Sequence, residues 1–316
     1  MSRYDIIFIG TAIVDSIIRG FDPEPVSATG FVADSGTLNI GGEAVNGAIA
    51  AAKLGMKTGI LCHLGSDPAG SMIEAELARW GVDTGLIVRS EGHPTPVTTM
   101  FVAEDGSRKS ITNGSHRYNF HPERYEELFC DAGALVLGSL FRAPFDEPGV
   151  IRKVVETAHS HGIKVFADTK LPNFAKLKLT DISDSLPLID YITPNEDEGR
   201  FYTGQDDPGK MADVFLDAGV CNVIIKLGAR GCLFKNREDM ISLPAYEIDA
   251  LDATGAGDNF LAGFASEIVS GKDVGSALVF ANACGAVCAS EVGACTALQN
   301  REQIKEFINL YERRGN

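Results

Sequence analysis

The chain has 316 residues, of which 45% are apolar and 22% charged, and these fractions exclude a disordered, collagen-like or disulfide-rich protein. Its 28 basic and 43 acidic residues give a formal net charge of −15, which disfavours binding to nucleic-acid phosphates and to anionic membrane surfaces. No apolar run approaches the roughly 18 residues of a membrane span. The seven cysteines show no CxxC pair and no zinc-binding spacing, so we expect reduced thiols in a cytoplasmic protein.

Short apolar runs alternate with amphipathic helical segments along most of the chain. The runs predict strands at Asp5–Ile9, Lys57–Cys62, Ala134–Leu137, Ile163–Ala167, Tyr191–Thr193 and Asn222–Leu227. Between the second and third of these strands, Ile73, Leu77 and Trp80 share one face of a predicted helix that ends at Gly81. Uninterrupted apolar strands separated by helices are typical of a parallel sheet that is covered on both faces. We therefore predict a three-layer α/β fold with a mostly parallel central sheet.

Two segments, about 13–40 and 89–113, contain extended runs but no helical period. In the second segment, Val97–Ala103 and Ser107–Thr112 flank Glu104-Asp105-Gly106, a pattern that predicts a β-hairpin. We predict that the two segments form a small β-sheet lid on one domain spanning residues 1–316. Because the edges of an exposed small sheet tend to be covered, we also expect a homodimer through this lid.

A glycine-rich turn in front of a helix gives the strongest chemical signal. Gly255, Ala256 and Gly257 expose consecutive backbone N–H groups, and apolar residues at helical spacing follow. Such N–H groups and the helix dipole both favour a bound anion. Asp258 lies in the first helical turn, where its carboxylate can take a proton from a hydroxyl that attacks a bound phosphate. The alternative is that Asp258 is only a favourable N-terminal charge beside a tight turn.

Polar residues near two other predicted elements favour a ligand site. Gly41 and Gly42 precede a helix and allow close approach of the backbone to a ligand, and Asn46 can donate to and accept from a hydroxyl. Asp15 follows the first strand, where α/β sheets place ligand-binding groups.

Asn195 and Glu198 lie three residues apart at the start of another predicted helix. Their oxygens can orient Mg²⁺ and its waters. The same spacing is that of a capping box, and both interpretations stay open.

The segments GGEAVN, PNEDEG, KLGARG and DATGAGDNFLAGF occur in the order and at the separations of the ribokinase-like (PfkB) carbohydrate kinase family, which nearly the whole chain resembles. The resemblance implies an ATP- and Mg²⁺-dependent kinase that phosphorylates a primary hydroxyl of a small sugar. It implies that Asp258 is the general base and that the amides of residues 255–257 form an anion hole. The positions that match sugar contacts are Asp15, Gly41, Gly42 and Asn46.

The resemblance also implies nucleotide and cation sites. Glu198, through water, and Asn195 match an element that serves Mg²⁺ and phosphate. The positions that match ATP contacts are Asn195, Lys226, Gly228, Gly231 and Asn282. Many members bind a monovalent cation such as K⁺, and the matching positions are Asp252, Thr254, Cys288, Glu291, Gly293 and Ala297.

Departures from the family pattern leave the acceptor open. Glu43 stands where ribose-specific members usually have Lys, and residues 138–142 lack the carboxylate that binds sugar in ribokinases. Members that act on 2-keto-3-deoxygluconate often have an Arg shortly after the segment matching 168–173, whereas this chain has Lys176. The alternatives are a nucleoside or sugar-acid kinase of the same family, or a catalytically silent homologue that binds sugar or nucleotide as a regulator.

Overall fold

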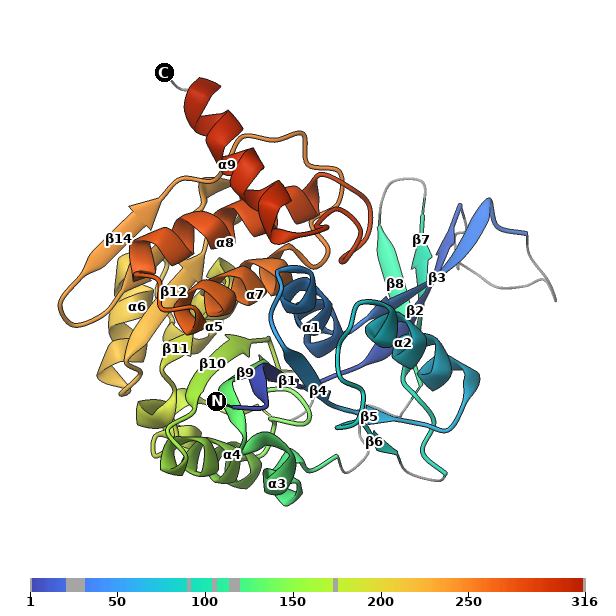
Figure 1. Ribbon diagram of the computed structural model, residues 1–316, viewed down its shortest axis with the longest axis horizontal. Coiled ribbons are helices and arrows are strands. Elements are labelled where there is room, and N and C mark those ends of the chain that lie inside the picture. Colours follow the sequence, from blue (N-terminus) through green and yellow to red (C-terminus); the bar gives the residue numbers. More distant parts are fainter. Residues whose placement is uncertain are drawn as a thin grey trace.

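The computed structural model describes residues 2–20, 32–89, 92–103, 107–113, 120–172 and 176–314. Within these residues the strands form an eight-stranded sheet, a four-stranded sheet and a two-stranded sheet (Figure 1). The predicted turn at Glu104-Asp105-Gly106 and residue Asn173 of the segment 168–173 lie outside the described residues.

The strands and helices follow one another in the alternating order that the sequence predicts. The strands are β1 (Tyr4–Ile9), β2 (Ile13–Arg19), β3 (Ser35–Gly41), β4 (Thr58–Leu61), β5 (His63–Leu64), β6 (Val88–Arg89), β7 (Val97–Val102), β8 (Arg108–Thr112), β9 (Ala132–Leu140), β10 (Lys164–Thr169), β11 (Tyr191–Ile192), β12 (Asn222–Lys226), β13 (Cys232–Lys235) and β14 (Met240–Leu243). The helices are α1 (Glu43–Lys53), α2 (Pro68–Arg79), α3 (Glu126–Phe129), α4 (Pro148–Ser160), α5 (Glu196–Thr203), α6 (Pro208–Asp217), α7 (Ala256–Val269), α8 (Val274–Ala289) and α9 (Arg301–Arg314).

The large sheet has the strand order β14-β13-β12-β11-β10-β9-β1-β4. Its strands from β12 to β4 pair in parallel, whereas β13 and β14 extend the sheet as antiparallel strands. The sequence analysis did not predict β13 and β14. Because parallel strands leave their carboxyl ends at one edge of the sheet, this order gathers the loops after β1, β9 and β10 on the same side.

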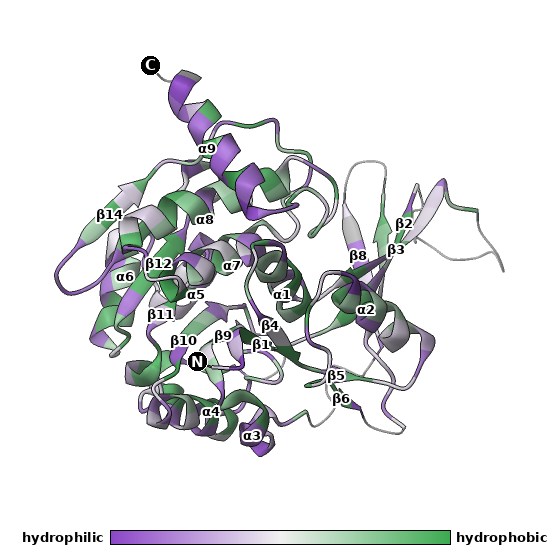
Figure 2. Cartoon of the chain, viewed as in Figure 1, coloured by the Kyte–Doolittle hydropathy of each residue, from purple (hydrophilic) through white to green (hydrophobic). Residues whose placement is uncertain are grey.

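Both faces of the large sheet are buried, because successive side chains of a strand point to opposite sides. In β9, Leu135 and Leu137 pack into a core with residues of α3, α4 and α6, whereas Ala134 and Val136 pack into a second core with residues of α1, α2, α7 and α8. Figure 2 shows the apolar central strands between helices whose outer sides are polar. The three-layer fold with a mostly parallel sheet is therefore confirmed.

The small four-stranded sheet has the order β3-β2-β7-β8 and is built from the two segments that the sequence analysis singled out (Figure 1). Strand β2 pairs antiparallel with β3, from Ile13 opposite Gly41 to Arg19 opposite Ser35, and in parallel with β7. Most of the edge strand β3 is exposed. That this sheet acts as a lid, and that residues 1–316 form one domain, stay predictions.

No helix within the described part of the chain is both long and apolar enough to cross a membrane. All seven cysteines are free thiols.

Candidate active site

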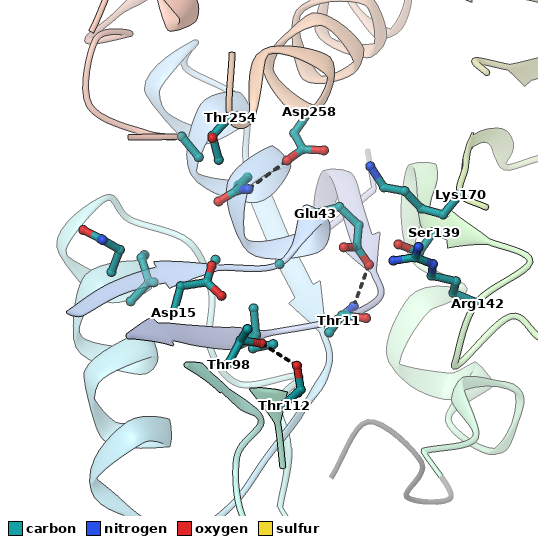
Figure 3. A pocket seen from close by; sticks show the side chains of 18 of the residues that line it. Thr11, Asp15, Glu43, Thr98, Thr112, Ser139, Arg142, Lys170, Thr254 and Asp258 are labelled. Carbon is teal, nitrogen blue, oxygen red and sulfur yellow. Dashed lines mark hydrogen bonds between the residues drawn. The ribbon is translucent and has the colours of Figure 1, made fainter. Parts of the chain in front are cut away.

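A cavity of about 1360 Å³ lies between the small sheet and the loops that follow β1, β9 and β10 (Figure 3). The beginning of α7 closes it from another side. The residues from the sequence analysis that line this cavity are Asp15, Gly41, Gly42, Asn46, Asp252, Thr254, Gly255, Asp258 and Gly293. The fold thus brings together residues that are more than 200 positions apart in the chain.

The turn before α7 requires glycine. Gly255 is the N-cap of the helix with φ +78°, and a Cβ there would lie 2.4 Å from Cβ of Ala294. The N–H of Ala256 donates to the carbonyl of Ala253 at 3.2 Å, so this amide is engaged within the turn. That the amides of Gly255, Ala256 and Gly257 form an anion hole stays a prediction.

Asp258 and Asn46 meet at the beginnings of two neighbouring helices, α7 and α1. Nδ2 of Asn46 donates to Oδ2 of Asp258 at 2.8 Å. Burial raises the pKa of Asp258 to about 6, although the ammonium of Lys170 and the bond from Asn46 act in the opposite direction. The negative charges of Asp168 and Glu43 add to the rise. A carboxyl group with this pKa can exchange a proton near neutral pH.

The paired glycines allow the loop after β3 to lie close to β1 and β2. Gly42 is the N-cap of α1 with φ +96°, and a Cβ there would lie 2.3 Å from the carbonyl oxygen of Thr11. A Cβ on Gly41 would lie 2.6 Å from Oδ2 of Asp15. Asp15 is half-buried on β2 with its carboxylate toward the cavity (Figure 3), and burial raises its pKa. Glycine at position 41 thus leaves this carboxylate accessible to a ligand.

Several cavity residues have no counterpart among the predicted sugar contacts. The hydroxyls of Thr98 and Thr112 are hydrogen-bonded at 2.8 Å across the β7–β8 hairpin, where the two residues are register partners. The predicted hairpin pairs these two threonines across its strands, so the sequence could have placed both side chains on the same face of the sheet. Oε1 of Glu43 accepts from N of Thr11 at 3.3 Å, and it lines the same cavity.

The end of β9, at Ser139, and the loop after this strand bring a guanidinium to the cavity. Ser139 and Phe141 are buried and have φ values of 61° and 77°, a conformation that residues other than glycine rarely adopt. Nε of Arg142 donates to the carbonyl of Leu171 at 2.5 Å, and the side chain reaches the cavity wall (Figure 3). Because strain of this kind is concentrated at functional sites, the loop is a candidate part of the acceptor site.

The carboxyl ends of β10 and β12 carry a buried ion pair. Nζ of Lys226 lies 2.5 Å from Oδ1 of Asp168, and the hydroxyl of Thr193 donates to the same oxygen at 2.9 Å. The side chain of Asp168 is only 3% exposed, and Oδ2 has no hydrogen bond among the described residues. A Cβ on Gly257 would lie 3.3 Å from Nζ of Lys226, so this pair adjoins the turn before α7.

Asn195 and Glu198 form the predicted capping box at the start of α5. Oδ1 of Asn195 accepts from N of Glu198, and Oε2 of Glu198 accepts from N of Asn195, both at 2.9 Å. The hydroxyl of Thr169 also donates to Oε2 of Glu198 at 2.8 Å. Burial, and then the charge of Asp168, raise the pKa of Glu198. Glu198 and the nearby Asp168 therefore place carboxylate oxygens close together, and such oxygens are the ligands that fit Mg²⁺ and its waters.

The remaining predicted nucleotide contacts lie at the β12–β13 turn and on α8, and, like Asn195 and Lys226, they are not among the residues that line the cavity. Gly228 and Gly231 have φ values of 57° and 94°, and a Cβ on Gly231 would lie 2.0 Å from the carbonyl oxygen of Leu243. Nδ2 of Asn282 donates to the carbonyl of Pro244 at 3.3 Å. The glycines fix the turn, and their contact with a nucleotide stays a prediction.

The positions that match a monovalent cation site surround the turn before α7. Asp252 accepts from N and Oγ1 of Thr254, at 3.0 and 2.6 Å, and from N of Gly293 at 3.2 Å. Sγ of Cys288 lies 3.5 and 3.4 Å from the carbonyl oxygens of Thr254 and Ala294. Two main-chain oxygens thus lie close together there, and main-chain oxygens are ligands that suit K⁺. By contrast, Glu291 is exposed, and Ala297 is buried in the core between α8 and α9.

Comparison with known proteins adds independent information. A family model described as pfkB family carbohydrate kinase matches residues 6–301. Ribokinase from Haemophilus influenzae is 28% identical over 276 residues, which cover 85% of this chain and 87% of that protein. Deoxyribokinase from Salmonella typhi is 27% identical over 314 residues, which cover 98% of this chain and 100% of that protein.

A solved structure shows the same fold. Arabidopsis thaliana ribokinase complexed with ribose and ATP has a TM-score of 0.84 at 24% identity, and the match covers 98% of this chain and 99% of that one. The resemblance that the sequence motifs indicate is thereby confirmed.

Proposed function

Because this chain belongs to the pfkB family of carbohydrate kinases, we propose that it transfers the γ-phosphoryl group of ATP to a primary hydroxyl of a small sugar. The observation that carries the proposal is the carboxyl group of Asp258. It lines the cavity in the first turn of α7, held by Asn46 at 2.8 Å, with its pKa raised to about 6 by burial. A carboxylate there is ready to receive the proton of an acceptor hydroxyl.

The transfer has a simple balance of atoms and electrons. The acceptor oxygen forms a bond to the γ-phosphorus while the bond from that phosphorus to the β–γ bridging oxygen breaks. ADP leaves with the electron pair, and the acceptor proton passes to Asp258. The amides of Gly255 and Gly257 and the N-terminus of α7 stabilise the charge on the transferring group. Little covalent chemistry is asked of the protein, so positioning supplies most of the rate.

The described residues also fit the other reactants. Asp15, Asn46 and the Thr98–Thr112 pair offer hydrogen-bond partners for sugar hydroxyls, and the small sheet can cover them and exclude water. Glu198, and Asp168 beside it, would hold waters of Mg²⁺, which when bound neutralises phosphate charge. Lys226, at the end of β12, places its ammonium beside Gly257 in the first turn of α7, where it would hold Asp168 near the nucleotide phosphates.

A sugar acid is a second candidate acceptor. Arg142 reaches the cavity from a strained loop, and a guanidinium is well suited to bind a carboxylate through two hydrogen bonds. Glu43 on the same wall opposes an anion, which favours the neutral sugar as the first candidate.

The experiment is an ADP-release assay with ATP, Mg²⁺ and a panel of ketoses, pentoses, sugar acids and nucleosides, with ³¹P NMR of the product. We expect acceptor-dependent ADP release and a phosphomonoester on a primary hydroxyl. Binding of sugar and nucleotide without any product would instead support a silent regulatory homologue.

We further propose that the enzyme works in the cytoplasm, a reducing compartment that the seven free thiols favour, and that it forms a homodimer through the small sheet. Leu38 on β3 and Ile111 on β8 are 61% and 68% exposed on the two edge strands. Sedimentation analysis of Leu38→Glu beside the wild type tests the second statement, because the charge should shift a dimer toward the monomer.

A further inference from the structure

Lys170 lines the cavity next to the buried carboxylate of Asp168. It is the first residue after β10, and its N–H donates to the carbonyl of Leu140 at 3.0 Å. The hydroxyl of Tyr202 donates to the carbonyl of Lys170 at 2.6 Å. Both main-chain groups are therefore fixed. The side chain extends from this position into the cavity, toward Asp258 (Figure 3).

Carboxylates surround the ammonium group of Lys170. Burial alone would lower the pKa of Lys170, but the negative charges of Asp168, Asp258, Glu43 and Glu198 outweigh burial and raise it well above its ordinary value. The group is therefore charged at any physiological pH. Two of these carboxylates, Glu43 and Asp258, line the cavity, whereas Asp168 on β10 and Glu198 on α5 lie outside its lining.

Lys170 and Lys226 flank the same carboxylate in different ways. Lys226 is 13% exposed and bonds Oδ1 of Asp168 at 2.5 Å, so its charge is used within the protein. Nζ of Lys170 is 3.9 Å from Oδ2, too far for a hydrogen bond, and its side chain is 31% exposed. Within the described ranges the ammonium of Lys170 donates no hydrogen bond, which leaves its three donors available to a ligand in the cavity.

We propose that Lys170 is a further catalytic residue, which binds the terminal phosphoryl group of the nucleotide as that group passes to the acceptor. This inference rests on the proposed function. During transfer the acceptor oxygen bonds to the terminal phosphorus, the bond to the bridging oxygen of ADP breaks with its electron pair on ADP, and Asp258 takes the acceptor proton. Lys170 bonds the non-bridging oxygens, whose charge grows in a loose transition state.

A comparison of two nucleotides isolates this contact without any acceptor. We would measure by calorimetry the affinity of β,γ-imido-ATP and of ADP, each with Mg²⁺, for the wild type, Lys170→Met and Lys170→Arg. Lys164→Met, a change of an exposed lysine six residues earlier in the chain, is the matched control. The imido analogue carries the terminal phosphoryl group and ADP lacks it.

We expect Lys170→Met to weaken the imido analogue about 10- to 100-fold, the size of a lost hydrogen bond to a charged group, and to change ADP binding less than about 2-fold. Lys170→Arg should recover much of the affinity, and Lys164→Met should match the wild type. An equal loss for both nucleotides would show a structural role for Lys170, and no loss would show no contact; either result overturns the inference. A wild-type protein that binds neither nucleotide would overturn the proposed function itself.

Discussion

The two sheets of this molecule contribute to the cavity in different ways. Most strands of the large sheet, such as β9, are buried on both faces, and polar side chains at their carboxyl ends are fixed by one another, as in the bonds of Asp168 to Lys226 and Thr193. The small sheet is half open, with most of β3 exposed, and it presents Asp15 and the Thr98–Thr112 pair to the cavity. Under the proposed function, the buried large sheet would hold the reacting groups in place, and the more exposed small sheet would bind the acceptor.

The sharpest test of this difference is a substitution of Asp258, the proposed proton acceptor in α7. We expect Asp258→Asn to lower turnover about 10²- to 10⁴-fold, because the amide cannot accept the hydroxyl proton, while nucleotide and acceptor affinities stay near those of the wild type. Asn at 258 keeps an oxygen that can accept from Asn46. Steady-state kinetics and calorimetry provide the measurement, and Asp249→Asn, an exposed change, is the control. Near-normal turnover would refute the assignment.

The ion pair beneath the site tests how strongly the large sheet depends on its polar network. Lys226→Met leaves the 3%-exposed carboxylate of Asp168 with the Thr193 hydroxyl and the more distant ammonium of Lys170, and we expect the free energy of unfolding to fall by about 3 kcal/mol in urea titrations. The double variant Asp168→Asn/Lys226→Met should recover most of that loss. If the double variant is as unstable as the single one, the loss of stability comes from the packing of the Lys226 side chain and not from the unpaired charge of Asp168.

On the small sheet, the expected effect is on affinity alone. We predict that Asp15→Ala raises KM for the acceptor about 10- to 100-fold, as for a lost hydrogen bond to a charged group, with kcat within about 3-fold of the wild type. Initial-rate measurements with the best acceptor of the panel decide this. A loss confined to kcat would place Asp15 with the catalytic groups and abolish the division between the sheets.

The smallest expected effect is a gain of stability. The pKa of Asp258 rises from 3.8 to about 6 on folding, so above pH 6 the folded protein holds an ionised group that the unfolded chain solvates better. We expect Asp258→Asn to raise the free energy of unfolding by about 1 to 2 kcal/mol at pH 8, with the gain declining between pH 6 and pH 4 and absent below. Denaturant titrations at several pH values give the measurement. A gain that does not depend on pH would contradict the assigned pKa shift.

Sequence patterns predicted most of the large sheet but not its edge. The parallel strands carry long apolar runs because both of their faces are buried, so periodicity and length identify them. Strands β13 and β14 are four residues each, and the partly exposed alternation of Met240–Leu243 carries little signal. The four strands of the small sheet fall within the two segments that lacked a helical period.

For the site, glycine-rich motifs marked the positions where the backbone is constrained. Gly42 and Gly255 have positive φ values and no room for a Cβ, so the chain requires glycine there whatever its neighbours are. Lys170 and Arg142 were not predicted as cavity residues. Each follows a strand end at which the direction of the side chain depends on tertiary contacts, such as the bonds to Leu140 and Leu171.

The hydrogen bond between Asn46 and Asp258 joins residues separated by 212 positions. During synthesis the ribosome therefore releases more than four fifths of the polypeptide before the two helix ends can meet. A chain that ends before α7 contains the residues of the small sheet and of the first strands, but it lacks Asp258, the proposed proton acceptor. Under the proposed function, phosphoryl transfer therefore requires that translation be nearly complete.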